Sequence, residues 1–387
     1  MYYALIFASN GAYFSYISLY YADISLDNMQ IGILTSVTAI VALFGQPLWG
    51  IAGDRAKFKN NILILCVFAS TFSIWLIQWS GNVMWMLIVF TALFSLFHSA
   101  VGPLSDAISL ELAEKQKFSF SRVRAFGSLG FALMSVVAGW MFQSGTQSIF
   151  LLFFIVMMGA LALSFTIPRI EGHQSGGRKV GILQLFNNKQ LVAIYAFSLI
   201  LSTTMGFFFS FQAVYSEEVG IGTDLIGLGL MIGSFSQFPF MLFFDKWYRR
   251  FGILNILLAS GVFHAVRWLL YATSLTPVTI LFLWILHGGT FILFYLCLAE
   301  YVNRHVMMEL QATGQMMNAV ITNGISRIIG GFLGGWFASE FGFQSAFFAA
   351  GWICVAATVG FYLMIRYTRL FRENSKPAAS AEMSREA

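Results

Sequence analysis

The chain has 387 residues, of which 58% are hydrophobic and only 10% are charged, and its formal net charge is +5. Soluble domains carry about 25% charged residues, so this composition excludes an ordinary water-soluble fold. Apolar stretches of about twenty residues recur along the chain, and a helix of that length crosses the roughly 30 Å hydrocarbon layer of a membrane while satisfying its own backbone hydrogen bonds. The sequence therefore predicts an all-α integral membrane protein.

The apolar stretches between polar breaks predict twelve transmembrane helices. The first six are expected at residues 2–22, 29–52, 61–79, 83–107, 122–143 and 147–167. The second six are expected at residues 189–216, 224–245, 252–272, 276–301, 312–339 and 343–366. The first stretch has no basic head and no small-residue cleavage site, which indicates a retained helix and not a secretory signal.

A polar interval separates the first six predicted helices from the second six. The two halves repeat a pattern in which Gln and Pro precede an acidic-basic pair, at residues 46–55 and 237–246. Duplicated six-helix units place a solute site at their interface, so we expect two pseudo-symmetric bundles that rock about it. The expected parts are an amino-terminal bundle (1–167), a cytoplasmic linker (168–188), a carboxy-terminal bundle (189–366) and a disordered cytoplasmic tail (367–387).

The basic loop residues predict the orientation, because cytoplasmic loops retain Lys and Arg. All of them fall on the side of the amino terminus: Arg55, Lys57, Lys59, Lys115, Lys117, Lys179, Lys189, Lys246, Arg249, Arg250, Arg304, Arg366, Arg369 and Arg372. The opposite loops carry acidic residues and neither Lys nor Arg. We therefore expect a multi-pass protein of the cell membrane with both termini cytoplasmic. No basic cluster extends beyond short loops, which argues against nucleic acid as a partner.

Several motifs resemble the major facilitator superfamily. The run Gln-Pro-Leu-Trp-Gly-Ile-Ala-Gly-Asp-Arg at residues 46–55 is similar to the signature loop of that family. Runs at residues 103–107, 121–128, 266–268 and 286–291 look like the lactose permease and 3-phenylpropionate transporter branch. The resemblance implies the major facilitator fold and a proton-coupled symporter that works by alternating access. It also implies a sugar, a nucleoside or an aromatic acid as solute, and we expect a monomer.

Four charged residues lie deep in predicted helices, where each costs about 2.5–3.5 kcal/mol to insert and so indicates a function or a partner. They are Asp106, Arg124, Arg267 and Arg327. Asp106 ends one predicted helix and Arg124 begins the next, so antiparallel packing would bring them face to face. The resemblance matches both to substrate-binding residues. The alternative is a permanent structural ion pair.

By the same resemblance, Arg267 and His287 match a network for substrate binding and proton coupling, although a neutral packing histidine is the alternative at His287. Asn323 aligns with a lysine of lactose permease, and Arg327 lies one helical turn further on. Arg327 is thus expected either in the cavity or at a cytoplasmic gate. Tyr16 is a candidate for stacking on the solute, in a first helix rich in tyrosine.

Gln237 stands where relatives of the phenylpropionate type carry a glutamate, and it cannot ionise. Either it imitates a protonated glutamate, as an engineered substitution would, or coupling uses Asp106 and His287, another ion, or none. An uncoupled facilitator or exporter is therefore the alternative to proton symport. A set of gating residues is expected from the signature loop and its counterpart: Gly50, Asp54, Arg55 and Asp245, together with Arg327.

The sequence gives no sign of catalysis. It has no Gly-rich phosphate loop, no His-rich metal cluster and no nucleophile elbow. Cys66, Cys297 and Cys354 lie within predicted spans without metal-ligand spacing. We therefore expect no enzyme activity, no catalytic residue, no cofactor and no metal. A receptor that binds solute without moving it remains an alternative from another class.

Overall fold

The computed structural model describes residues 1–117, 120–171, 188–273, 276–306, 314–315 and 317–367, and the side chains of residues 113, 114 and 120–125 lie outside the description. Nearly all of the expected linker and tail therefore lies outside the described residues. The described chain is helical apart from short connections and one isolated β-bridge between Phe58 and Glu171. The prediction of an all-helical fold is confirmed.

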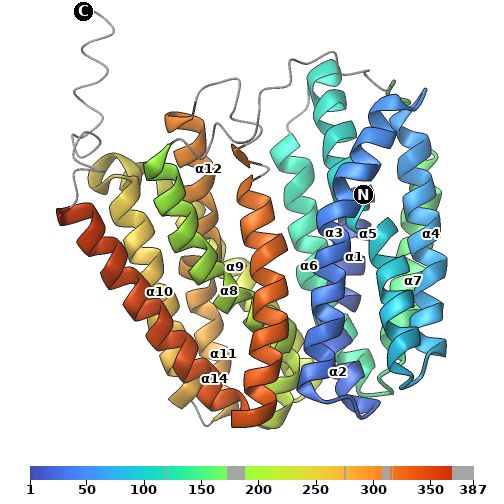
Figure 1. Cartoon of the computed structure of the whole chain (residues 1–387). Coiled ribbons are helices and arrows are strands. Elements are labelled where there is room, and N and C mark those ends of the chain that lie inside the picture. The colour runs from blue at the N-terminus through green and yellow to red at the C-terminus, as the bar shows by residue number, and fades with distance from the viewer. Residues whose placement is uncertain (118–119, 172–187, 274–275, 307–313, 316, 368–387) are drawn as a thin grey trace, which may run out of the picture. The chain divides into compact units, whose positions relative to one another are not determined.

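The first half of the chain forms seven helices (Figure 1). They are α1 (Tyr2–Tyr13), α2 (Ile17–Asp23), α3 (Asn28–Arg55), α4 (Lys59–Trp79), α5 (Met84–Gln116), α6 (Phe120–Phe142) and α7 (Ser148–Ser164). The second half contains α8 (Lys189–Glu218), α9 (Thr223–Phe251), α10 (Ile253–Thr273), α11 (Pro277–Leu283), α12 (Leu293–His305) and α14 (Ser326–Tyr367).

Eight helices among the described residues are long and apolar enough to cross a membrane, and two shorter apolar helices cover residues 126–142 and 148–164. The last long helix contains two predicted spans, because Gly342 adopts a φ of 80° and turns the chain between them. A positive φ of this kind favours glycine, which has no Cβ to clash with the backbone. These helices support a multi-pass membrane protein, while the count of twelve spans remains a prediction.

Two predicted spans are broken into shorter pieces. The first is interrupted at residues 14–16, where Tyr16 leaves the helical region with φ −127° and ψ −6°. In the tenth, a 3-10 turn (Trp284–Leu286) and a π-helix (Gly288–Ile292) separate α11 from α12. The amide of Gly288 donates to Ser236 Oγ of α9 at 2.9 Å. Helical irregularities of this kind are frequent at functional sites.

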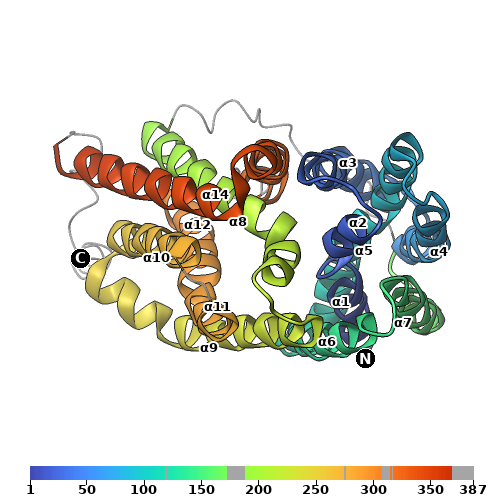
Figure 2. The same ribbon diagram turned by 90° about the horizontal axis from the view of Figure 1, so that it is seen from below.

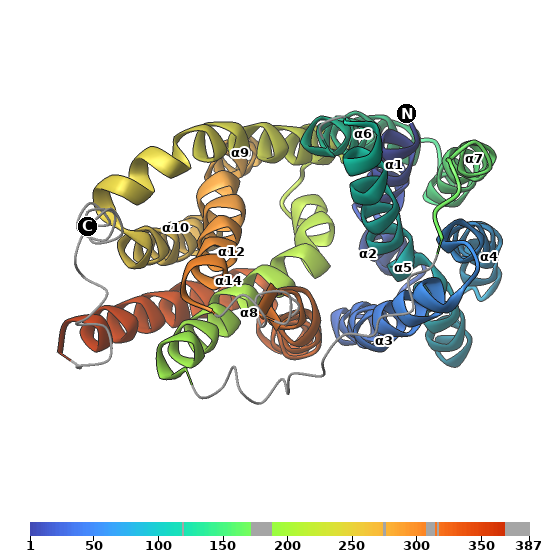
Figure 3. The same cartoon turned by 90° about the horizontal axis from the view of Figure 1, so that it is seen from above.

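The described residues fall into two compact units that differ from the two sets of six spans. Unit 1 comprises residues 1–177, 207–231 and 327–339, and unit 2 comprises residues 178–206, 232–326 and 340–387. Within unit 1, α1 lies between α6 and α7, and α4 packs beside α5 and α7 (Figures 2 and 3). Within unit 2, α10 packs against α12 and the π-helix, and the rings of Phe197 and Phe361 stack 4.4 Å apart.

Unit 1 also joins the two halves of the sequence through glycines. Gly32 of α3 lies against the backbone of Gly331 and Gly335 of α14, and a Cβ at Gly227 of α9 would lie 2.7 Å from the Cα of Val136. The absence of a side chain lets these backbones approach closely. All of these contacts lie near the helix ends that the charge pattern assigns to the extracellular side.

Reciprocal glycines also bring α1 and α6 together. A Cβ at Gly11 would lie 2.6 Å from the carbonyl oxygen of Phe131, and a Cβ at Gly130 would overlap the backbone of Ala4. Backbone cannot rotate away as a flexible side chain can, so a methyl group at either position forces the two helices apart.

We expect Gly130→Ala to lower the free energy of unfolding by about 1–3 kcal/mol, the usual cost of overpacking. The measurement is thermal unfolding of the purified protein in detergent. Gly360→Ala is the matched control, because a Cβ at Gly360 of α14 meets nothing within 4 Å and alanine favours a helix by about 1 kcal/mol. Equal melting temperatures for the two variants would show that the α1–α6 contact tolerates a methyl group.

Candidate functional site

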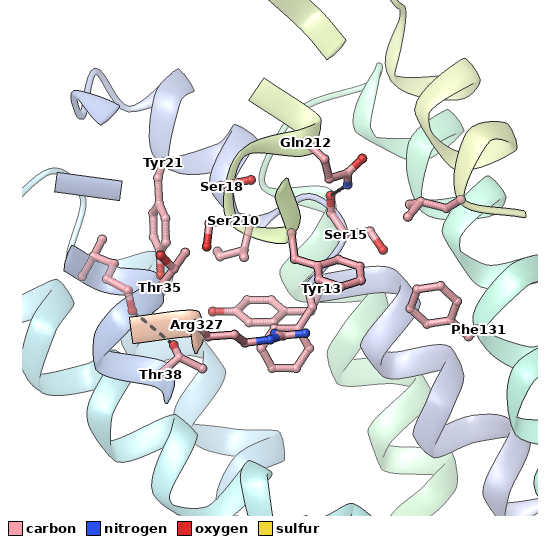
Figure 4. Close-up of a pocket in the computed structure, with 15 residues that line it drawn as sticks. Tyr13, Ser15, Ser18, Tyr21, Thr35, Thr38, Phe131, Ser210, Gln212 and Arg327 are labelled. Carbon is pink, nitrogen blue, oxygen red and sulfur yellow. Dashed lines mark hydrogen bonds between the residues drawn. The ribbon is translucent and has the colours of Figure 1, made fainter. Parts of the chain in front are cut away.

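A cavity of about 170 Å³ lies wholly within unit 1, lined by residues of α1 to α3, α6, α8, α9 and α14 (Figure 4). Its polar lining consists of Ser15, Ser18, Thr35, Thr38, Ser210, Gln212 and Arg327. Its aromatic lining consists of Tyr13, Phe14, Tyr21, Phe131 and Phe209. Among the described side chains that line this space, one is a cation and none is a carboxylate.

The helix break at residues 14–16 supplies the first part of the lining. Ser15 lies in the break itself and Ser18 is the second residue of α2. Thr35 and Thr38 follow on one face of α3, where their hydroxyls donate to the carbonyls of Gly32 and Leu34 at 3.0 and 3.2 Å. A hydroxyl that donates to its own helix still has lone pairs with which to accept a hydrogen bond from a solute.

Gln212 of α8 is anchored by one end of its amide. Its Nε2 donates to the carbonyl of Ser15 at 3.3 Å, as the dashed line in Figure 4 marks. Its Oε1 and the Oγ of Ser15 are buried and have no hydrogen-bond partner among the described residues. Gln212 is 4% and Ser15 is 5% exposed. Buried polar atoms without partners cost about 1–3 kcal/mol each, so this end of the cavity calls for a polar occupant.

Arg327 brings a positive charge to the lining. It begins α14, and its guanidinium carbon lies 5.1 Å from the centre of the Phe209 ring. Within the described part of the chain, no carboxylate lies within 4.0 Å of its nitrogens. Of the two locations expected for Arg327, the structure gives the cavity.

Arg267 and His287 meet inside unit 2, as the resemblance implied. Arg267 Nη1 lies 3.1 Å from His287 Nδ1 and donates to Thr290 Oγ1 at 2.8 Å. Arg267 is 0% exposed, and the rings of Trp268, Tyr271 and Trp284 lie 5.0, 5.6 and 5.5 Å from its guanidinium carbon. Aromatic faces attract a guanidinium, which helps to hold the charge away from water.

Asp106 lies in α5 and accepts a hydrogen bond of 2.6 Å from the hydroxyl of Tyr3. Arg124, its expected partner, lies in α6, but its side chain is outside the described residues. Asp106 belongs to unit 1 and the Arg267–His287 pair to unit 2.

Three other predicted site residues do not line the cavity. Tyr16 is buried, and its hydroxyl donates to the carbonyls of Ser135 and Thr223 at 2.7 and 3.3 Å. Asn323 is exposed in a second π-helix (Val320–Ile325), and its amide donates to Thr322 Oγ1 at 3.3 Å. Gln237 is half-buried in the part of α9 that belongs to unit 2. Tyr16 thus ties α6 to the start of α9.

Comparison with known proteins agrees with this architecture. Residues 1–349 match the model of the MFS_1 like family. The chain belongs to this family. The resemblance to the major facilitator superfamily is therefore confirmed, and this family consists of membrane transporters.

The chain is 29% identical to the maltose permease of Geobacillus stearothermophilus over 346 residues, which cover 86% of each chain. It is 24% identical to the lactose permease of Citrobacter freundii over 379 residues, which cover 90% of this chain and 89% of the permease. The crystal structure of the nucleoside transporter NupG aligns with a TM-score of 0.83 at 20% identity, covering 95% of this chain and 98% of NupG. NupG therefore shares the fold.

The predicted gating residues of this major facilitator chain have different surroundings. Asp54 Oδ1 lies 3.6 Å from Lys59 Nζ, which also lies 3.5 Å from Glu111 Oε2. This network ties the start of α4 to the ends of α3 and α5. Arg55 and Asp245 are exposed, and a Cβ at Gly50 would meet nothing within 4 Å.

Sequence reasoning missed the polar lining of the cavity. Ser15 and Ser18, and likewise Thr35 and Thr38, lie three residues apart within apolar stretches, which puts each pair on one helical face. That spacing was a usable signal. Gln212 was a second one, since it is an uncharged amide in the middle of an apolar helix.

We expect Thr290→Val to lower the free energy of unfolding by about 1–3 kcal/mol, because it removes the hydroxyl that accepts from the buried Arg267. Thr290→Ser is the matched control, since it keeps the hydroxyl and loses only the methyl group. Thermal unfolding in detergent measures both. If serine destabilises as much as valine, packing of the methyl group and not the hydrogen bond holds this site together.

Proposed function

We propose that this chain is a secondary transporter that carries a small organic solute across the cell membrane by alternating access of two six-helix bundles. Both termini are cytoplasmic, twelve helices span the membrane, and the monomer is the working unit. The observation that carries the proposal is the cavity of unit 1, in which polar side chains and an arginine lie among apolar and aromatic ones inside apolar helices. A soluble enzyme or scaffold has no need of such a chamber inside membrane-spanning helices.

The contacts within unit 1 support alternating access. Tyr16 bonds to both Ser135 and Thr223, and Ser36 Oγ donates to the carbonyl of Ile328 at 3.1 Å. The bonds of Tyr16 to Thr223 and of Ser36 to Ile328 join the first half of the chain to the second near the predicted extracellular end. In our proposal they separate when the site opens outward. The Asp54–Lys59–Glu111 network then acts at the opposite end, together with Gly50, Arg55 and Asp245.

Proton coupling, in our proposal, uses Asp106. A carboxylate inside the membrane is costly, and the hydroxyl of Tyr3 donates a hydrogen bond to this one. A proton that arrives at Asp106 removes that charge and so shifts the balance between conformations. His287 is the weaker carrier, because a proton on its ring would place a second positive charge beside the guanidinium of Arg267.

An uncoupled facilitator or exporter is the second candidate. It is favoured by Gln237, which cannot carry a proton. The cavity lining, moreover, contains no carboxylate to which a proton might bind beside the solute.

Uptake into proteoliposomes, with and without an inward proton gradient, separates the two candidates. We expect the gradient to drive accumulation of a labelled solute, chosen from a sugar, a nucleoside, an aromatic acid and a sugar acid. Asp106→Asn is expected to reduce this accumulation by about tenfold or more. Exchange of solute across the membrane should continue, because exchange needs no net proton movement. Glu340→Gln, an exposed acid on α14, is the control and is expected to behave like the unchanged chain.

Uptake that ignores the gradient in the unchanged chain would reject symport and favour the facilitator. If Gln237→Glu then confers gradient dependence, the glutamine is what had removed coupling. Binding of solute without any flux, even in exchange, would instead identify a receptor.

A further inference from the structure

We propose that the cavity of unit 1 binds a single-ring polyhydroxylated carboxylate, a sugar acid, with its carboxylate on Arg327 and its hydroxyls on Gln212 and Ser15. This inference names the solute of the transport site and therefore rests on the proposed function. The relatives reported above are named for neutral sugars and for nucleosides, and a further relative is named a probable 3-phenylpropionic acid transporter. The sugar-acid class is therefore argued from this chain's own lining.

The charge of the lining points to an anion. The guanidinium of Arg327 faces the cavity without a carboxylate within 4.0 Å among the described residues, and no Asp or Glu lines the space. Its contact with the Phe209 ring stabilises the positive charge less than water or a carboxylate would. A carboxylate fits the planar fork of a guanidinium with two parallel hydrogen bonds. A monoanionic solute thus neutralises the site when it binds.

The buried polar atoms point to hydroxyl groups on that anion. Gln212 Oε1 can only accept a hydrogen bond, and the Nε2 of the same amide is already held by the Ser15 carbonyl. Ser15 Oγ, at the same end, is also without a partner among the described residues. A solute hydroxyl satisfies the first by donating and the second by either role. An aromatic acid that lacks hydroxyls leaves both atoms buried and unpaired.

The size of the cavity points to one ring. Its volume is about 170 Å³, below the range of about 300–1,000 Å³ that holds drug-sized ligands. A hexuronate is a reasonable occupant for this space, and a disaccharide is too large for it. The rings of Tyr13 and Phe209 supply apolar faces for the C–H side of a sugar ring.

Binding to the purified full-length chain tests the inference, with D-glucuronate, D-glucose and 3-phenylpropionate as probes in isothermal titration at one ionic strength. We expect D-glucuronate to bind at least about tenfold more tightly than D-glucose, since a bidentate ion pair is roughly twice as strong as a neutral hydrogen bond. D-glucuronate is also expected to bind more tightly than 3-phenylpropionate, because only the sugar acid satisfies Gln212 and Ser15.

Substitutions assign each preference to its residue. Arg327→Gln is expected to remove the preference of D-glucuronate over D-glucose, and Arg327→Lys to retain part of it. Gln212→Leu is expected to remove the preference of D-glucuronate over 3-phenylpropionate. Arg366→Gln is the control, because Arg366 lies near the exposed end of α14 and does not line the cavity.

Equal or tighter binding of D-glucose by the unchanged chain overturns the inference and indicates a neutral sugar site, whether or not any variant folds. An Arg327→Gln variant that keeps the preference overturns the role of Arg327. Failure of the proposed function looks different: D-glucuronate binds as expected, but proteoliposomes neither accumulate nor exchange it.

Discussion

The cost of a buried polar atom without a partner organises this structure. Inside a membrane, a polar side chain is tolerated where it bonds to protein or faces a water-filled space, and elsewhere apolar residues are found. Many hydroxyls of the described residues bond to protein by donating to a carbonyl of their own helix, as Thr35 and Thr38 do. Gln212 is held at one end only, and its other end, with Ser15, is left to whatever enters the cavity. In our proposal, these two polar atoms form their hydrogen bonds with the solute when it binds in the cavity.

Breaks in the helices place these polar groups where they can bond outside their own helix. An unbroken first span would satisfy the backbone throughout, and the break at residues 14–16 instead sets Ser15 against Gln212. In unit 2 the 3-10 turn and π-helix beside His287 do the same for another polar group, because the amide of Gly288 bonds to Ser236 of a neighbouring helix. Both breaks therefore carry polar groups that a regular helix would keep to itself.

Hydropathy predicted the helical fold because a membrane admits few backbone arrangements, so length and apolar content are nearly sufficient. The contact between Arg267 and His287 was predicted only through a family resemblance, since they lie twenty residues apart on helices whose facing sides the sequence does not specify. Tyr16 shows the limit of composition: its aromatic ring suggested a stacking role, but its hydroxyl bonds to two backbone carbonyls. The helix breaks escaped prediction because they depend on bonds such as Gly288 to Ser236, which only tertiary packing creates.

The two described interior arginines show how one chain treats the same charge in two ways. Arg267 is enclosed by three aromatic rings within unit 2, and Thr290 accepts a hydrogen bond from its Nη1. Arg327 touches one described ring and opens onto the cavity. A guanidinium that faces a cavity can bind a solute, whereas one that is enclosed by protein side chains is less accessible to it. In our proposal, this difference in surroundings is the reason to place the solute carboxylate on Arg327, while the substrate-binding role expected for Arg267 stays a prediction.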